Sequence, residues 1–123
     1  MTKRKLIGHC AVDSGQLLVV DPCYLSEWKD GEFQPDDTDP KNIVASHYNT
    51  CCHLTMNNNQ GGEILVSGIG GFGVCCSSGL GDGNYPVYAE YMNIGTRSKP
   101  DIRISKLIID FQLKDMAEIY NKL

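Results

Sequence analysis

Short apolar runs alternate with turns rich in glycine, asparagine and aspartate along most of the 123-residue chain. This pattern predicts strands at residues 6–12, 16–20, 48–55, 63–67, 72–77, 85–91 and 102–111. Their spacing of about 8–12 residues is typical of an antiparallel sandwich or barrel-like sheet. We therefore predict a single, mostly β domain over residues 1–123.

Three local features refine this prediction. The turn at residues 13–15 ends in Gly15, which predicts a hairpin between the first two strands, because glycine accepts the positive φ of such a loop. Pro86 predicts that its segment is an edge strand, or that this proline lies among the first residues of a strand. The apolar alternation slips by one residue at Ser105 and Lys106, which predicts a β-bulge.

Three segments differ from the strand pattern. Leu113, Met116, Ala117, Tyr120 and Leu123 recur at three- and four-residue steps, which predicts one C-terminal helix. Residues 23–28 predict a short helical turn, and residues 29–41, with two prolines and one glycine, predict a long surface loop.

The charge balance limits the partners that we expect. The chain has 15 acidic and 11 basic side chains, a net charge of −4, and its basic residues are scattered. DNA and RNA polymers usually require a basic face, so we expect no polymeric nucleic acid. No apolar run approaches the roughly 20 residues that span a bilayer, and the first residues lack a secretory apolar segment. We expect a cytoplasmic protein without membrane contact.

The six cysteines are Cys10, Cys23, Cys51, Cys52, Cys75 and Cys76. Their spacing lacks the paired C-x₂-C pattern of zinc sites, and a chain of this size needs no disulfides to form a core. We expect buried thiols that behave as small apolar side chains, and no cofactor. The alternative is a metal site that uses His9, Cys10, Cys52 and His53.

Residues 68–73, Gly-Ile-Gly-Gly-Phe-Gly, match the G-x-G-x-x-G pattern of dinucleotide sites. That motif requires a helix directly afterwards, whereas Val74, Cys75 and Cys76 favour a strand. We therefore expect these glycines to supply bulges, close strand approach and positive φ. The alternative is a loop whose backbone amides approach an anion.

Aromatic and charged residues beside the turns form the candidate ligand site. Aromatic rings with a polar edge can stack on a base, and nearby cations can meet a phosphate. The candidate residues are Tyr24, Trp28, Asp82, Tyr85, Tyr88, Arg97, Arg103 and Lys106. The alternative is that the tyrosines are half-buried on the sheet, the cations are solvated and Asp82 shapes a turn. No known nucleophile motif surrounds the serines or cysteines, so we expect a protein that is not an enzyme.

Three segments resemble a known family. Residues 12–22, VDSGQLLVVDP, resemble the SGxLxxxDP opening of a DUF4241-type family of uncharacterised bacterial and phage proteins. Residues 81–88, GDGNYPVY, resemble its GDGxYPV segment, and residues 102–111 resemble its closing strand. The resemblance implies a β-rich fold and a bacterial or phage origin. The family has no assigned activity, so it implies no catalytic residue.

These observations lead to three ranked functions. The first is a homo-oligomer that binds a small nucleotide-like ligand without converting it, for example a phage sponge for a cyclic-nucleotide or ADP-ribose-type immune signal in the bacterial cytoplasm. The second is a protein-interaction module or inhibitor, which blocks a partner through a sheet edge or the 29–41 loop. The third is a nucleotide hydrolase.

Overall fold

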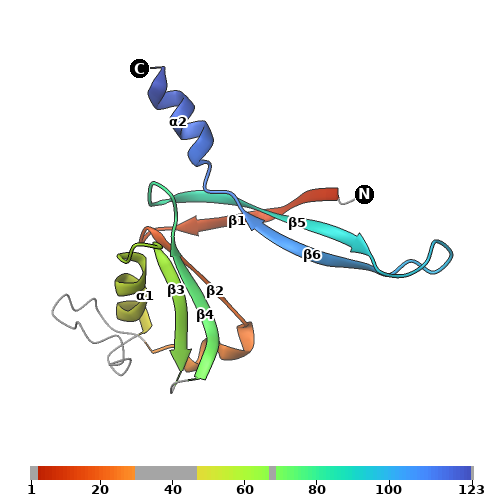
Figure 1. Ribbon diagram of the computed structural model, residues 1–123, viewed down its shortest axis with the longest axis horizontal. Coiled ribbons are helices and arrows are strands. Elements are labelled where there is room, and N and C mark those ends of the chain that lie inside the picture. Colours follow the sequence, from red (N-terminus) through yellow and green to blue (C-terminus); the bar gives the residue numbers. More distant parts are fainter. Residues whose placement is uncertain (1–2, 30–46, 67–68, 123) are drawn as a thin grey trace. The chain divides into compact units, whose positions relative to one another are not determined.

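The computed structural model describes residues 3–29, 47–66 and 69–122. The elements within these ranges are β1 (Lys3–Val12), β2 (Gln16–Val20), the 3-10 helix η1 (Pro22–Glu27), α1 (His47–Thr55), β3 (Gly61–Val66), β4 (Ile69–Ser77), β5 (Gly83–Asn93), β6 (Ile102–Ile109) and α2 (Leu113–Asn121) (Figure 1). The strands form two antiparallel three-stranded sheets, in the orders β1-β5-β6 and β2-β4-β3. The predicted mostly β fold, with antiparallel pairing and a C-terminal helix, is confirmed.

The chain divides into two compact units. Unit 1 comprises residues 1–13 and 82–123 and contains β1, β5, β6 and α2. Unit 2 comprises residues 14–81 and contains the other sheet with η1 and α1. The prediction of one β-rich domain over residues 1–123 stays a prediction.

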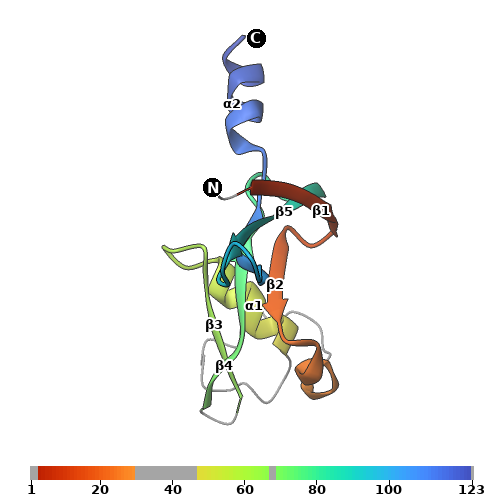
Figure 2. The same ribbon diagram turned by 90° about the vertical axis from the view of Figure 1, so that its right-hand side faces the viewer.

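The core of unit 2 lies between α1 and its sheet (Figure 1, Figure 2). Its buried residues are Cys51, Ile64, Phe72 and Cys75, and Leu18, Val20, Trp28 and Leu54 pack against them. Glycine allows the strands to approach closely, since a Cβ at Gly73 would lie 2.8 Å from the Val19 carbonyl oxygen. The small cysteine side chains, and the absence of a side chain at Gly73, therefore allow the helix and the three strands to pack close together.

The strand predicted at residues 48–55 is wrong, because these residues form the helix α1. Tyrosine, threonine and cysteine favour strands, and this composition conceals a helical spacing. His47, Cys51 and Leu54 are separated by four and three residues, and all three contact the core. Tertiary packing of this face therefore outweighs the weak local preference.

The predicted hairpin between the first two strands is also wrong. Gly15 has the expected positive φ of 70°, but β1 pairs with β5 and β2 pairs with β4. The turn at residues 13–15 therefore carries the chain from the sheet of unit 1 to the sheet of unit 2. Local turn chemistry predicted the conformation of Gly15 correctly, but it could not identify the partner strands.

Other local predictions are confirmed. The pairing of β5 with β6 skips Ser105 between Lys106 and Ile104, so the bulge lies where the alternation slips. Pro86 is the fourth residue of β5 and precedes the ladder with β6, although β5 is a central strand and not an edge. Residues 22–27 form the predicted helical turn, which begins where the Cys23 amide donates to the Asp21 carboxylate.

The remaining predictions concern the glycines and the loop. Residues 69–77 form a strand with φ +89° at Gly71 and a register shift beside it, which confirms bulges and positive φ in place of a dinucleotide loop. The loop predicted at residues 29–41 lies outside the described residues from residue 30 onwards. No helix in the described part of the chain is long and apolar enough to cross a membrane.

Candidate binding surfaces

The sheet of unit 1 has one apolar face. Because side chains alternate along a strand, the register places eight residues of β5 and β6 on the same side, and all but Asn93 are apolar or aromatic. Lys3 and Lys5 of β1 lie beside them on this side. This apolar face consists of Val87, Ala89, Tyr91, Ile102, Ile104, Leu107 and Ile109. Ile102, Ile104 and Leu107 are 58%, 57% and 51% exposed, so about half of each large side chain contacts water. Contiguous exposed apolar residues of this kind mark interaction surfaces.

The opposite face of the same sheet is charged. Its polar and aromatic residues are Arg4, Tyr88, Glu90, Arg103 and Lys106, and the strand pairing places Leu6, Met92 and Ile108 on the same side. In the strand register, Glu90 lies opposite Arg4 on β1 and opposite Lys106 on β6, so a carboxylate position lies between two cation positions. The Arg4 guanidinium carbon lies 4.6 Å from the centroid of the Tyr88 ring, a cation–π distance.

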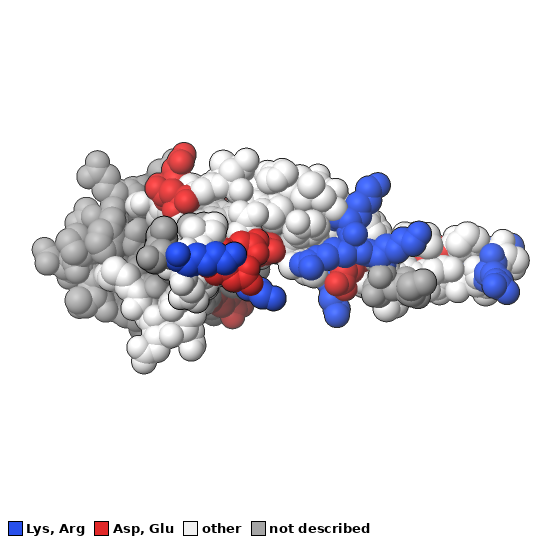
Figure 3. All heavy atoms as spheres, turned by 90° about the horizontal axis from the view of Figure 1, so that it is seen from above, with Lys and Arg blue, Asp and Glu red and all other residues white. Residues whose placement is uncertain are grey.

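Charge also differs between the two ends of this sheet. The end where β1 begins carries Lys3 and Lys5, and the loop between β5 and β6 adds Arg97 and Lys99 there; all four are exposed. Lys and Arg side chains gather over this part of unit 1 in the space-filling view (Figure 3). The other end carries the exposed Asp13, Asp82 and Asp110, which follow β1, precede β5 and follow β6.

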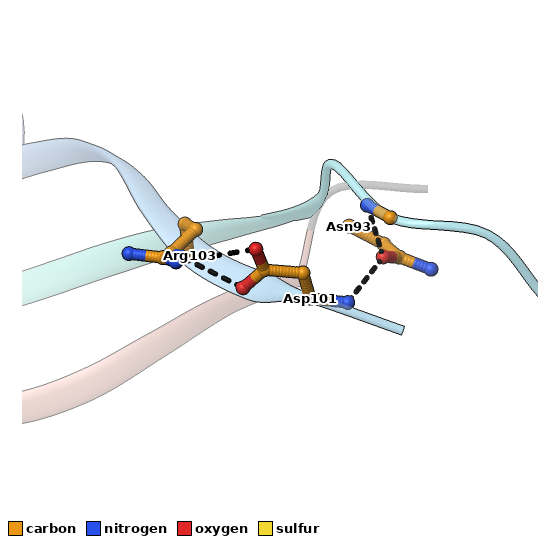
Figure 4. Close-up of polar contacts among 4 residues, drawn as sticks. Asn93, Asp101 and Arg103 are labelled. Carbon is orange, nitrogen blue, oxygen red and sulfur yellow. Dashed lines mark hydrogen bonds and ion pairs between the residues drawn. The ribbon is translucent and has the colours of Figure 1, made fainter. Parts of the chain in front are cut away.

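A hydrogen-bonded turn organises the basic end. The Asn93 side-chain oxygen accepts from the backbone amides of Gly95 and Asp101, both at 2.9 Å (Figure 4). Asp101 in turn accepts two bonds from Arg103, at 2.6 and 3.2 Å. Pairing with Asp101 raises the pKa of Arg103 above its usual range, so this guanidinium stays charged. The neighbouring carboxylate offsets the charge that Arg103 could offer to a phosphate.

Unit 2 contains two adjoining hollows between α1 and β2, with volumes of about 160 and 240 Å³. Ser14, Gln16 and Tyr48 line both of them. The Gln16 amide donates to the Cys52 sulfur at 3.4 Å, and its oxygen accepts from Thr55 at 3.4 Å and from Cys75 at 3.7 Å. The residues that line the hollows include no lysine or arginine, so these hollows suit a small uncharged molecule better than a phosphate.

The predicted site residues are divided between the two units. Tyr24 and Trp28 belong to unit 2, where their rings lie 6.1 and 6.5 Å from the Phe72 ring. The other six belong to unit 1: Asp82, Tyr85, Tyr88, Arg97, Arg103 and Lys106. Of these six, the sheet brings Tyr88, Arg103 and Lys106 together on the charged face.

The remaining predicted residues have other surroundings. Tyr85 is only 7% exposed and its ring meets Phe111 edge-on at 5.2 Å. Arg97 lies in the loop after β5, and Asp82 is exposed in the turn before β5. Tyr85 therefore packs inside unit 1. Tyr88, in contrast, lies on the charged face, where Arg4 contacts its ring.

Sequence reasoning missed the apolar face and the residues around Gln16. The alternation of Ile102, Ile104, Leu107 and Ile109 was visible, but such a pattern is equally typical of a buried strand face. Gln16 is a variable position of the SGxLxxxDP segment, and Tyr48 belongs to no motif and lies in a segment whose composition favours a strand. Only the pairing of distant segments reveals either feature.

His47 at the start of α1 is hydrogen-bonded to Lys29. Its backbone amide donates to the Lys29 carbonyl at 3.0 Å, and its Nδ1 accepts from the Lys29 amide at 2.8 Å. Burial lowers the pKa of His47 below the usual 6.5, and the nearby Lys29 charge lowers it further. The imidazole is therefore neutral at neutral pH and serves as an acceptor and as part of the aromatic core.

The cysteines are all free thiols. Cys51 and Cys75 are buried in the core as predicted, whereas Cys23 is exposed and does not follow that prediction. Cys23 lies in η1, whose six residues include none that is buried. Within residues 3–29, 47–66 and 69–122, no three histidine, cysteine, aspartate or glutamate side chains are grouped so that they could hold a metal ion.

Comparison with known proteins gives one match. Residues 7–96, which are 90 of the 123 residues, match a family described as "Protein of unknown function (DUF4241)". The matched range contains residues 12–22 and 81–88, and it ends before β6 and α2. No curated protein and no solved structure matches the chain.

Proposed function

The chain belongs to the DUF4241 family, whose function is unknown, and from its geometry we propose that it is a protein-interaction module that binds a second copy of itself through the apolar face of unit 1. The single observation that carries this proposal is the exposure of Ile102, Ile104 and Leu107 on one side of β6. Full burial of an exposed side chain of this size is worth roughly 1.5–3 kcal/mol, and because these three are already about half buried, covering each of them is worth about half of that.

The charge distribution favours a second copy as the occupant. A two-fold axis that lies in the interface, perpendicular to the strands, places the apolar face on itself and reverses the strand direction. The basic end of one copy, with Lys3 and Lys5, then lies over the acidic end of the other, with Asp13 and Asp82. An axis parallel to the strands would instead oppose like charges.

The test is the mass of the protein in solution. Light scattering after gel filtration, at several concentrations, should give twice the 13.6 kDa mass of the chain. Ile104→Lys should shift the mass to that of the monomer, because it places a charge in the apolar face. Met92→Lys is the matched control, since Met92 is 48% exposed on the other side of the same sheet. Circular dichroism checks that both variants fold.

Two results would contradict this proposal. One is a wild-type monomer at every concentration, which would favour a partner of another kind. The other is equal dissociation by Met92→Lys and Ile104→Lys, which would mean that the apolar face is not the contact.

A second candidate, the binding of a small nucleotide-like ligand, is favoured by the charged face. The Tyr88 ring, whose centroid lies 4.6 Å from the Arg4 guanidinium carbon, could stack on a base. Arg4 and Lys106, which lie opposite Glu90 on the two neighbouring strands, would supply positive charge on the same surface. A phage sponge that sequesters an immune signal in the bacterial cytoplasm would use such a surface, and so would a nucleotide hydrolase.

A thermal-shift screen tests this candidate with cyclic dinucleotides, cyclic ADP-ribose isomers and ordinary nucleotides. A ligand at about 100 times its Kd should add roughly 2.7 kcal/mol to the free energy of unfolding. Tyr88→Ala and Lys106→Ala should weaken the shift, whereas Arg97→Ala should leave it unchanged. A sponge returns the ligand intact after denaturation, and a hydrolase returns a product.

A further inference from the structure

Two thiols from different elements meet in the core of unit 2. Cys51 on α1 and Cys75 on β4 are 2% and 1% exposed, and both belong to the same cluster of packed core side chains. A hydrogen bond between the two thiols is the largest influence on the pKa of each. They are 24 residues apart in the chain, so packing of the helix on the sheet brings them together. A contact between two thiols in one core is the arrangement from which a disulfide can form.

The two thiols can be reached by a small molecule. Both line the hollow of about 160 Å³, together with Ser14, Gln16 and Tyr48. This hollow is partly open to solvent and far exceeds the space that one water molecule needs. Most of its lining is apolar, from Leu17, Leu18 and Trp28 among others, and Ser14, Gln16 and Tyr48 supply the polar groups that could hydrogen-bond hydrogen peroxide next to the sulfur atoms.

Hydrogen bonds connect the two sulfurs with Gln16. The Cys51 thiol donates to Cys75, which raises the pKa of Cys51 and lowers that of Cys75. Cys75 in turn donates to the Gln16 oxygen at 3.7 Å. Since the thiolate is the nucleophile, the sulfur that loses its proton reacts first and the other sulfur follows.

We propose that Cys51 and Cys75 form a peroxide-sensitive thiol pair, which closes to a disulfide between α1 and β4. The thiolate of one of the two cysteines attacks one peroxide oxygen, the O–O bond breaks, and water leaves with the proton, which gives a sulfenic acid on that cysteine. The sulfur of the other cysteine then displaces the hydroxyl group as a second water. The two thiols lose two electrons and one hydrogen peroxide is reduced to two waters.

The first experiment uses the full chain and graded hydrogen peroxide, followed by trapping of free thiols with N-ethylmaleimide. Mass spectrometry without reduction should find a Cys51–Cys75 cross-link and four remaining free thiols of the six, and dithiothreitol should restore all six. Cys52→Ser and Cys76→Ser should keep the cross-link, because neither removes a sulfur of the pair. Cys75→Ser and Cys51→Ser should each abolish it.

The proposal is overturned if the wild-type protein cross-links through Cys52 or Cys76, or if the exposed Cys23 is oxidised while Cys51 and Cys75 stay reduced until the protein unfolds. The wild-type mapping decides this even if one serine variant fails to fold. Because unit 1 contains neither thiol, the result is independent of the mass measurement that tests self-association.

Discussion

Two neighbouring polar side chains of unit 1, Asn93 and Arg103, contribute differently to the stability of the fold. In unit 1, Asn93 holds the turn after β5 with two hydrogen bonds from backbone amides, whereas Arg103 forms an ion pair with the Asp101 carboxylate on the exposed surface. A bond that fixes the backbone orders a whole turn, and an exposed ion pair is screened by water. The amide of Asn93 therefore matters more for folding than the more conspicuous ion pair.

Asn93→Ala should lower the free energy of unfolding by about 1 kcal/mol, because two backbone amides lose their acceptor and turn to water. Chemical denaturation followed by circular dichroism measures the change. Arg103→Ala is the control, and its effect should be clearly smaller. The opposite order would mean that the ion pair, and not the Asn93 amide, fixes the turn.

His47 makes the stability of unit 2 depend on pH. Its folded-state pKa is lowered, so the unfolded chain takes up a proton near pH 6.5 while the folded chain does not. The free energy of unfolding should therefore fall as the pH drops below about 6.5, and it should stop falling once the folded form is also protonated. Denaturation at about pH 7.5 and 5.5 measures this loss.

His47→Gln should flatten this pH dependence, since its side-chain oxygen can accept the Lys29 amide but does not titrate. His9→Gln serves as control, because His9 is exposed on β1, and should keep the wild-type profile. A wild-type profile that is flat across this range would show that His47 does not carry the effect.

At the scale of elements, the loop between β5 and β6 requires a glycine. A Cβ at Gly95 would collide with the Lys99 carbonyl oxygen and would lie 2.8 Å from the Asp101 nitrogen. Both atoms belong to the backbone, so the turn must open to make room.

Gly95→Ala should therefore lower the free energy of unfolding by about 1–3 kcal/mol, as overpacking does elsewhere. Gly8→Ala in β1 is a matched control, since a Cβ there meets nothing within 4 Å, and its effect should stay within about 0.5 kcal/mol. Thermal denaturation of both variants compares them. Equal midpoints for the two variants would show that the loop accommodates the extra carbon.

The elements show which parts of the fold the sequence could predict. The bulge at Ser105, the turn at Gly15 and α2 follow from local spacing, and the structure has all three. α1 was missed because its stabilisation comes from packing of Cys51 and Leu54 against a sheet formed by other segments. Local residue preferences determine the turns and the periodicity of exposed and buried positions. Whether residues 47–55 form a helix or a strand is instead determined by packing against segments that are distant in the sequence.

The same limit applies to the candidate site. Tyr88, Arg103 and Lys106 were predicted as ligand residues, and strand pairing does bring them to one face. Tyr24 and Trp28 belong to the aromatic cluster around Phe72, which no spacing in the sequence indicates. The exposure of Ile102 and Ile104 could not be predicted, because an apolar alternation does not show whether anything covers it.

At the scale of the whole molecule, association through the apolar face should depend on salt. If the basic end of one copy opposes the acidic end of another, Lys3→Glu with Lys5→Glu should weaken the dimer at low ionic strength. The effect should shrink at about 1 M salt, where the Debye length is about 3 Å. Sedimentation at both salt concentrations measures the dissociation constant.

Adding Asp13→Lys and Asp82→Lys to the same chain should restore association, because the charges are then exchanged between the two ends. If the variant with all four substitutions does not regain association, although it and the variant with two substitutions both fold, the apolar contact still stands. The antiparallel orientation that we propose for the two copies would then be refuted. Asp110 is left unchanged because its carboxylate accepts the Gln112 amide.

The path of the chain through two sheets has a consequence for synthesis on the ribosome. β1 pairs with β5 from Val12–Gly83 to Lys3–Tyr91, and all of unit 2 is translated in between. At roughly 5–20 residues per second, the 71 residues from Val12 to Gly83 take several seconds. Throughout this time the first strand, with Leu6 and Ile7, has no partner from its own sheet. The nascent chain should therefore offer chaperones an apolar N-terminal segment until β5 leaves the ribosome.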